Sequence, residues 1–186
     1  ENLVNEFSDF ARMPKPVFKK INLLTIIKEN ISLLNQIDDS ISINFTNQEK
    51  QCSFNCDSEQ ISRVFFNLVK NSIESIQEKS LKTKVFDKII NIEIKTISDY
   101  IIIEIIDNGL GFPIEETKEL IKPYYTTKQK GTGLGLSIVN KIISDHNGSI
   151  NFNSQENGAK IQLILPLNNV NWNINNWWQC RYSFNT

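Results

Sequence analysis

The order of apolar and polar residues along the chain predicts helices interleaved with strands. Over the opening residues, apolar side chains recur every three or four positions, which is typical of a helix, and Pro14 and Pro16 end it. We therefore expect residues 1–16 to be the end of a helix followed by a linker. A strand over 17–22 and a helix over about 23–37 come next. A further strand is predicted where apolar and polar residues alternate, at Ile41, Ile43 and Phe45.

The middle of the chain has the strongest helical pattern. Asp57 or Ser58 is a favourable N-cap for a helix over residues 57–78. Two isoleucine-rich segments follow, 88–97 and 100–106, and the polar pair between them predicts a hairpin of adjacent strands. The apolar stripe of the helix consists of Ile61, Val64, Phe65, Leu68, Ile73 and Ile76.

The last third of the chain predicts one helix and two strands. Residues 113–131 contain two prolines and show no clear period, so a mobile segment with one helical turn is expected. Apolar spacing then predicts a helix that starts near Leu134 and is closed by Asn147-Gly148, a favoured C-cap pair. Two strands are expected around the turn at Asn157-Gly158, over residues 149–153 and 160–165.

These elements predict one domain with two layers. Their order is typical of an α+β protein, a two-layer α/β sandwich in which one mixed sheet carries helices on one face; a doubly wound parallel sheet fits less well. At 186 residues the chain has room for one domain, which we expect over residues 17–167. Residues 168–186 crowd asparagine and tryptophan together and are expected to be an atypical tail.

Composition argues against several classes of protein. Twenty basic and 21 acidic residues leave a net charge of −1, so no overall field would hold a nucleic acid. Cys52 and Cys56, with one further cysteine and a single histidine, favour neither a zinc site nor a disulfide framework, and indicate a reducing, cytoplasmic setting. The longest apolar stretch, residues 101–106, is interrupted by Glu104 and is far shorter than the ~20 residues of a membrane-spanning helix.

A glycine-rich segment precedes the last predicted helix. Gly131, Gly133 and Gly135 alternate with Thr132 and Leu134. Glycine lets a backbone approach a phosphate closely, and the N-terminus of a helix offers free N–H donors and the positive end of the helix dipole. The same pattern is also typical of a plain loop, so by itself it leaves phosphate binding and a structural turn as equal alternatives.

An aspartate stands at the end of the second isoleucine-rich strand. Asp107 is followed by Asn108 and by two glycines, Gly109 and Gly111. A buried carboxylate can accept a hydrogen bond from the exocyclic amine of adenine, whereas guanine would present it with an acceptor. A strand-to-turn motif in which the aspartate bonds its own backbone is the structural alternative.

The helix predicted over residues 57–78 carries a polar line beside its apolar stripe. Asn67, Asn71 and Glu74 fall at i, i+4 and i+7. Asn71 lies nearest the apolar edge, where its amide oxygen could ligate a Mg²⁺ ion that also binds phosphate oxygens, because Mg²⁺ keeps waters and needs few protein ligands. A solvated helix face is the alternative.

Taken together, the motifs occur in an order that resembles a known family. They are similar to the N, G1, F and G2 boxes of the ATP-binding catalytic domain of sensor histidine kinases, and the resemblance covers roughly residues 17–166. Within that family the N box, the F box and residues 4–16 are most similar to nitrogen-regulation sensor kinases. The four boxes are residues 66–74, 107–112, 123–128 and 131–136.

The resemblance implies a role for each matching residue. Asp107 would accept a hydrogen bond from the adenine amino group. Asn71 would hold Mg²⁺ between the phosphates, with Asn67 as a support or second contact. Lys128 would supply positive charge to the phosphates, and Asn67 and Lys128 are the expected catalytic residues. The other expected nucleotide-binding residues are Gly109, Gly111, Tyr125, Thr127, Gly131, Thr132, Gly133, Leu134, Gly135 and Leu136.

One position separates a kinase from the hydrolases that share this fold. In the related gyrase, chaperone and mismatch-repair ATPases, a glutamate four residues before the magnesium-binding asparagine activates water. Here that residue is Asn67, an amide that cannot act as a general base, so a phosphotransferase is favoured. The only histidine, His146, is expected to be a helix-end residue and not the phosphoacceptor.

The resemblance also implies partners. The cofactors would be ATP and Mg²⁺, and the phosphoryl group would go to a histidine on a dimerisation domain whose second helix would end within residues 1–16. From there it would pass to the receiver domain of a response regulator. The full-length protein would be a membrane-anchored homodimer with this domain in the cytoplasm. Two alternatives remain open: a nucleotide-binding regulatory module without transfer activity, and an ATP-hydrolysing relative.

Overall fold

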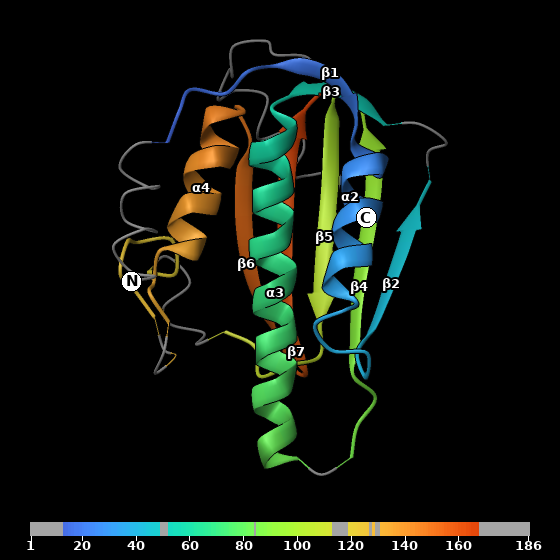
Figure 1. Ribbon diagram of the computed structural model, residues 1–186, viewed down its shortest axis with the longest axis vertical. Coiled ribbons are helices and arrows are strands. Elements are labelled where there is room, and N and C mark those ends of the chain that lie inside the picture. Colours follow the sequence, from blue (N-terminus) through green and yellow to red (C-terminus); the bar gives the residue numbers. More distant parts are fainter. Residues whose placement is uncertain are drawn as a thin grey trace.

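A computed structural model describes residues 13–48, 52–83, 85–112, 119–126, 128 and 131–167 of the chain. Within these residues the chain forms three helices and seven strands, and each helix stands between strands in the sequence (Figure 1). The elements are β1 (Lys19–Asn22), α2 (Leu23–Leu34), β2 (Ser42–Asn47), β3 (Ser53–Cys56), α3 (Ser58–Lys82), β4 (Ile89–Ile97), β5 (Tyr100–Asp107), α4 (Gly135–Asp145), β6 (Ser149–Gln155) and β7 (Gly158–Pro166).

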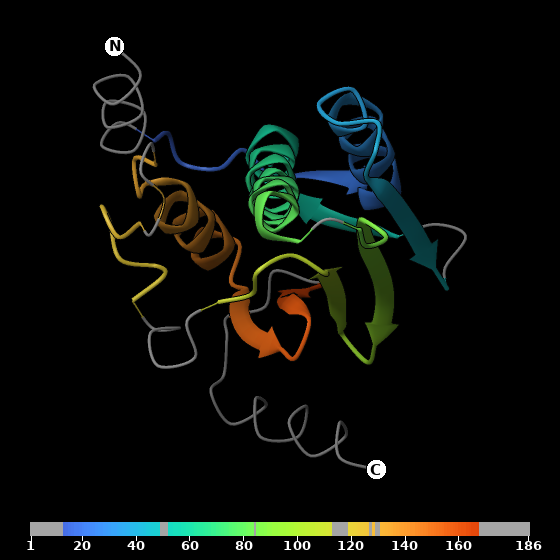
Figure 2. The same ribbon diagram turned by 90° about the horizontal axis from the view of Figure 1, so that it is seen from below.

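Five of the strands form one mixed sheet, in the order β2-β4-β5-β7-β6. β2 runs parallel to β4, and the other neighbours are antiparallel. α2, α3 and α4 all lie on one face of this sheet, which is clearest when the molecule is seen from below (Figure 2). The predicted two-layer sandwich with a mixed sheet and helices on one face is therefore confirmed.

The core lies between the sheet and the helices. Side chains alternate across β5, so Ile101, Ile103 and Ile105 all point toward the helices and are fully buried. Asp107 is the next residue in that row and the last residue of the strand. Because Asp107 continues the row of core isoleucines, its carboxylate lies where the sheet meets α3.

The charged residue that interrupts the isoleucine stretch lies on the other face of the sheet. Glu104 is buried, and its carboxylate is paired with Lys160 at 2.8 Å and with Lys95 at 3.5 Å. Gln162 donates a further hydrogen bond to it at 2.8 Å. These partners satisfy the buried charge, as a buried carboxylate requires.

β1 and β3 form a separate two-stranded antiparallel sheet. β1 was expected within residues 17–22, but as part of a single sheet, and β3 was not predicted at all. β3 has only four residues, of which Phe54 and Cys56 are buried and two are exposed, too few for a clear alternating pattern. Cys52 and Cys56 are both free thiols and both buried.

A side-chain cap marks the start of α3, and a backbone cap marks the end of α4. The Asp57 carboxylate accepts hydrogen bonds from the backbone of Glu59 and Gln60, both at 3.1 Å, which confirms Asp57 as the N-cap of α3. α3 continues to Lys82, beyond the predicted residue 78. At the end of α4, Asn147 adopts a positive φ of 57°, and Gly148 N–H donates to Ile143 O at 2.8 Å, so this pair closes the helix as predicted.

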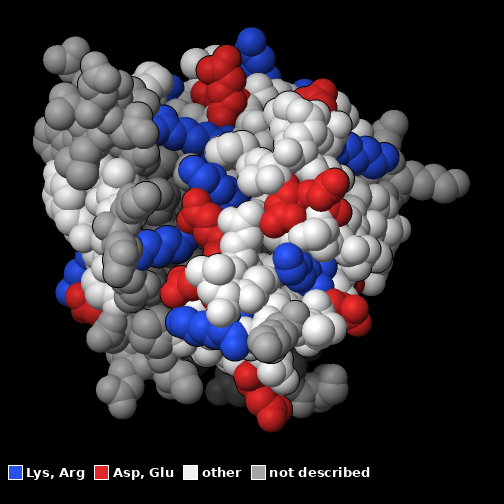
Figure 3. All heavy atoms as spheres, turned by 60° about the horizontal axis from the view of Figure 1, so that its bottom comes forward, with Lys and Arg blue, Asp and Glu red and all other residues white. Residues whose placement is uncertain are grey.

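Charges of both signs are mixed over the face seen in Figure 3, where Lys and Arg side chains lie next to Asp and Glu. A phosphate group on this face would therefore have to be bound by specific local contacts. Among the described helices, none has both the length and the apolar character needed to cross a lipid bilayer.

Candidate functional site

Asp107 is a buried carboxylate at the end of β5, with 4% of its surface exposed. Its Oδ2 accepts a hydrogen bond from Ser72 Oγ of α3 at 2.9 Å, and its Oδ1 accepts from the backbone N–H of Gly109 at 3.0 Å. Burial raises the pKa of Asp107, although these hydrogen bonds and the nearby Lys79 ammonium favour the charged form. The site therefore holds a hydrogen-bond acceptor in an environment with little water.

The loop after Asp107 packs closely against α3 and against the turn between β6 and β7. A Cβ on Gly109 would lie 2.3 Å from Ser75 Oγ, and this hydroxyl accepts a hydrogen bond from Leu110 N–H at 2.9 Å. A Cβ on Gly111 would lie 2.7 Å from the carbonyl oxygen of Gly158. The two glycines of the G1 box are therefore required by close packing, and they fix the loop beside the carboxylate.

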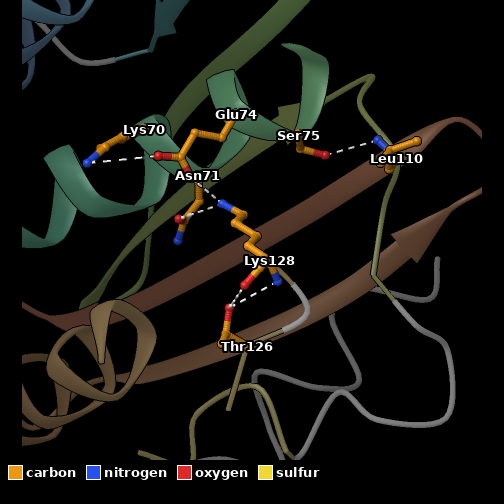
Figure 4. A network of polar contacts seen from close by, with 7 residues as sticks. All are labelled: Lys70, Asn71, Glu74, Ser75, Leu110, Thr126 and Lys128. Carbon is orange, nitrogen blue, oxygen red and sulfur yellow. Dashed lines mark hydrogen bonds and ion pairs between the residues drawn. The ribbon is translucent and has the colours of Figure 1, made fainter. Parts of the chain in front are cut away.

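The polar line of α3 faces Lys128. The ammonium of Lys128 donates to Asn71 Oδ1 at 3.3 Å and forms an ion pair with Glu74 (Figure 4). Lys70 approaches the other oxygen of Glu74 at 3.9 Å. The backbone of Lys128 is held by Thr126, whose Oγ1 accepts from Lys128 N–H at 3.1 Å.

Asn67 lies one helical turn before Asn71 and points toward the start of α4. Its Nδ2 donates to Arg63 O of the same helix at 2.9 Å. Its Oδ1 lies 3.6 Å from the position that a Cβ on Gly135 would occupy, which is ordinary contact distance. Asn67 is thus at the contact between α3 and the glycine-rich segment.

The glycine-rich segment leads into α4 and packs on the chain near Tyr124. Gly133 has a φ of +70°, and a Cβ there would lie 2.4 Å from the carbonyl carbon of Tyr124. Tyr124 N–H donates to Gly133 O at 2.9 Å, so the two segments are joined. A Cβ on Gly131 would similarly lie 2.4 Å from Thr126 Oγ1. A side chain at Gly133 would both strain the backbone and break the contact between Gly133 and Tyr124.

α4 begins at Gly135 without a side-chain cap. The N-cap residue is Leu134, which is buried and makes no capping hydrogen bond through its side chain. Leu134 N–H is directed at Thr132 Oγ1 at 3.4 Å. Leu136 is half-buried in the first turn. A helix that starts in this way has backbone N–H groups suited to an anion, because its first turn is capped by no acidic or hydroxyl side chain.

Two predicted residues remain to be placed. Tyr125 is half-buried, and its backbone N–H donates to Lys122 O at 3.3 Å. Thr127 lies outside the described residues.

All four boxes meet along one helix. Successive turns of α3 contact the start of α4 through Asn67, the F box through Asn71, and the G1 box through Ser72 and Ser75. The fold thereby brings together residues that are far apart in the sequence: Asn67 and Gly135, for example, are separated by 68 positions.

Three contributors to this arrangement were not predicted. Ser72 bonds Asp107, Ser75 bonds the G1 loop, and Gly158 lets the turn between β6 and β7 approach the end of β5, since its Cβ would lie 1.9 Å from Asp107 O. Ser72 immediately follows Asn71, but a serine on a helix has no distinctive pattern. Gly158 was recognised only as a turn residue.

His146 is a structural residue at the end of α4. It is 2% exposed, and its Nε2 accepts a hydrogen bond from Asp57 N–H at 3.0 Å. Nδ1 must therefore carry the proton, which it donates to Ile142 O at 2.8 Å. Burial lowers the pKa of His146. Both ring nitrogens are occupied in a contact that joins α4 to the N-cap of α3, which confirms the prediction of a helix-end residue.

The chain belongs to the family of histidine kinase-, DNA gyrase B- and HSP90-like ATPases, which it matches over residues 56–169. Within this family it is a histidine kinase ATPase domain, homologous to sensor kinases of the NtrY type. It is 34% identical over 175 residues to an NtrY-like sensor histidine kinase of Rickettsia felis, with 94% of this chain covered. It is also 34% identical over 165 residues to the nitrogen regulation protein NtrY of Azorhizobium caulinodans, with 88% covered.

Solved structures support the same assignment. The nucleotide-free catalytic domain of the histidine kinase ThkA superposes with a TM-score of 0.72 at 28% identity, covering 82% of this chain and 97% of that one. ThkA in complex with the response regulator protein TrrA shares the fold, with a TM-score of 0.75 at 24% identity over 89% of this chain and 46% of that one. The chain spans only 28% of the Rickettsia relative and 21% of the Azorhizobium relative.

Proposed function

We propose that this domain binds Mg²⁺·ATP at α3 and supplies its γ-phosphoryl group to a histidine on a dimerisation domain, for relay to a response regulator. The observation that carries the proposal is the meeting of a buried carboxylate, a half-buried amide oxygen, a lysine and an uncapped helix start along one helix. Each group suits a different part of ATP: Asp107, bound by Ser72, suits the base, Asn71 the metal, and the start of α4, beside Asn67, the phosphates.

The chemistry of the residues present fits the nucleotide. Asp107 can accept from the adenine amino group, because its two oxygens together have about four lone pairs, more than the hydrogen bonds from Ser72, Gly109 and Ala159 use. The N–H groups at the start of α4 can bind phosphate oxygens. Asn71 offers an amide oxygen that already accepts from a cation, the ammonium of Lys128.

The same residues would support transfer. When bound, Mg²⁺ would neutralise charge on the phosphates, with Asn71 as its protein ligand. Lys128 would add a second positive charge, and Asn67 would hold the phosphate end against the start of α4. Asn67 cannot take a proton from water, which supports transfer over hydrolysis. Phosphoryl transfer needs mainly this positioning and charge, and the nucleophile would come from the partner domain.

The assembly follows from the same proposal. The acceptor histidine would belong to a dimerisation domain continuous with residues 1–16, and the domain itself to residues 17–167. The whole protein would be a membrane-anchored homodimer with this domain on the cytoplasmic side. The homology to sensor kinases supports this arrangement.

A reconstitution in two parts tests the function. The chain is mixed with a separately produced histidine hairpin of an NtrY-type kinase and with γ-labelled ATP, and label on the histidine is measured. Label transfer is the expected result. ATP binding without transfer would instead favour a regulatory module, and turnover of ATP by the isolated chain would favour a hydrolase.

Asn71→Ala is the informative variant in this experiment. Loss of the metal ligand should abolish most Mg²⁺-dependent transfer, a decrease of roughly 100-fold or more if it removes 3 kcal/mol of charge stabilisation. Asn153→Ala, at an exposed position of β6, is the matched control and should retain full activity. Equal activity of both variants would contradict the metal assignment.

A further inference from the structure

Lys128 has two partners on α3, and both lie where the proposed metal would bind. Its ammonium bonds Asn71 Oδ1 at 3.3 Å and pairs with the carboxylate of Glu74 (Figure 4). The side chains of Lys128 and Glu74 are 35% and 37% exposed, so the pair is partly shielded from water. In Figure 4 the oxygen of Asn71 faces the ammonium, and its nitrogen points away.

A metal ion and this ammonium compete for the oxygen of Asn71. Mg²⁺ binds oxygen ligands at about 2.0–2.1 Å and requires near-octahedral geometry. A divalent cation at that distance from Asn71 Oδ1 would lie within a few ångströms of the Lys128 ammonium, and the two positive charges would repel each other strongly. Binding of the metal with its nucleotide therefore favours displacement of Lys128 from Asn71.

We propose that Glu74 is a positioning residue that holds Lys128 on Asn71 until Mg²⁺ and nucleotide displace it. The proposal rests on the proposed function, because it concerns the same metal ligand. It makes Lys128 a competitor of the metal in the nucleotide-free state, and it gives the Glu74 carboxylate, which pairs with this ammonium, a defined role.

The surroundings of Glu74 keep the free-energy cost of losing Lys128 small. Lys70, one turn earlier on α3, approaches Glu74 Oε1 at 3.9 Å. When Lys128 leaves, the carboxylate keeps this second cation and its exposure to water. Once the metal has displaced it from Asn71, Lys128 is free to approach the phosphates of the nucleotide. Glu74 therefore sets the affinity for the metal complex without blocking it.

The test is titration calorimetry of Mg²⁺·ADP against the wild-type chain and Glu74→Gln. A partly exposed ion pair contributes about 0.2–1 kcal/mol, so its removal should strengthen binding of Mg²⁺·ADP by roughly 1.4-fold to fivefold. The gain should be absent when ADP is titrated in EDTA, because Lys128 need not leave Asn71 without the metal. Glu78→Gln is the matched control, since it removes an equivalent i,i+4 partner of Lys82 on the same helix.

A double-mutant cycle separates this mechanism from a general effect of charge. Glu74→Gln removes a negative charge near the phosphates, which by itself would favour an anion. If that were the cause, the gain would persist in a Lys128→Met background and in EDTA, and either result would overturn the proposal. A gain that requires both Lys128 and Mg²⁺ supports it. If the wild-type chain bound no Mg²⁺·ADP, the proposed function itself would fail, which is a distinct outcome.

Discussion

The Asp107→Asn variant changes hydrogen bonding at one buried atom while the fold keeps its contacts. In the wild-type domain, Oδ1 accepts from Gly109 N–H at 3.0 Å and Oδ2 accepts from Ser72 Oγ at 2.9 Å. An asparagine can keep its oxygen on Gly109 and donate from its nitrogen to Ser72, because a hydroxyl can accept as well as donate. We therefore expect the variant to fold.

The effect should fall on adenine. The amide nitrogen that replaces Oδ2 cannot accept a hydrogen bond, and the neutral amide oxygen that remains is a weaker acceptor for the amino group of the base than a carboxylate. A hydrogen bond to a charged group contributes about 1.5–3 kcal/mol, so the Kd for Mg²⁺·ATP should rise by roughly 10-fold to 150-fold. The same nitrogen could donate to the oxygen of guanine, so the preference for ATP over GTP should shrink at the same time.

The thermal stability of the Asp107→Asn variant should not fall together with its affinity for ATP. Burial raises the pKa of Asp107 above its ordinary value of 3.8, so the folded domain holds this proton at a higher pH than the unfolded chain does. The contribution of this group to the free energy of unfolding therefore decreases as the pH rises through that window, and the ionised carboxylate is a cost at neutral pH. Asparagine removes this cost, and the Tm of the variant at pH 7 should be equal to or above that of the wild type.

Calorimetric titration with Mg²⁺·ATP and Mg²⁺·GTP, together with thermal denaturation, measures both effects. Ser72→Ala is a useful companion, because it keeps the carboxylate and should lose less affinity. A folded Asp107→Asn protein with unchanged affinity for ATP would refute the adenine assignment. A lowered Tm would show that the carboxylate stabilises the fold, contrary to the reasoning from its pKa.

Two further predictions concern backbone geometry and pH. Gly133→Ala places a Cβ 2.4 Å from Tyr124 at a φ of +70°. The variant should therefore lower the free energy of unfolding, measured by urea denaturation, by about 1–2 kcal/mol and weaken Mg²⁺·ADP binding. Wild-type values for both would contradict the assigned contact. Burial lowers the pKa of His146 below 6.5, so the unfolded chain takes up this proton first, and the free energy of unfolding should fall as the pH drops below that value. His146→Gln should be less sensitive to acid than the wild type between about pH 7 and 5, and an identical pH dependence of the two proteins would count against a buried neutral imidazole.

Much of the fold could be predicted because its elements have strong local signals. The apolar stripe of α3 and its Asp57 cap, the alternation within β4 and β5, and the Asn147-Gly148 closure of α4 each depend on residues near one another in sequence. Even Glu104, which breaks the isoleucine run, fits the strand pattern, since alternate residues face opposite sides of a sheet. By contrast, β3 has only four residues and pairs with β1, which is distant in the sequence, so no local pattern predicts it.

The sequence by itself determined which chemical groups this domain carries: the four boxes, in their order, with an asparagine where related hydrolases have a glutamate. Only the tertiary structure decided which of these groups touch. Ser72 reaches Asp107, and Lys128 reaches Asn71 and Glu74, because α3 packs between the end of β5 and the chain before α4. Residue type and periodicity report local conformation, whereas contacts between distant segments depend on how whole elements pack, which no short stretch of sequence encodes.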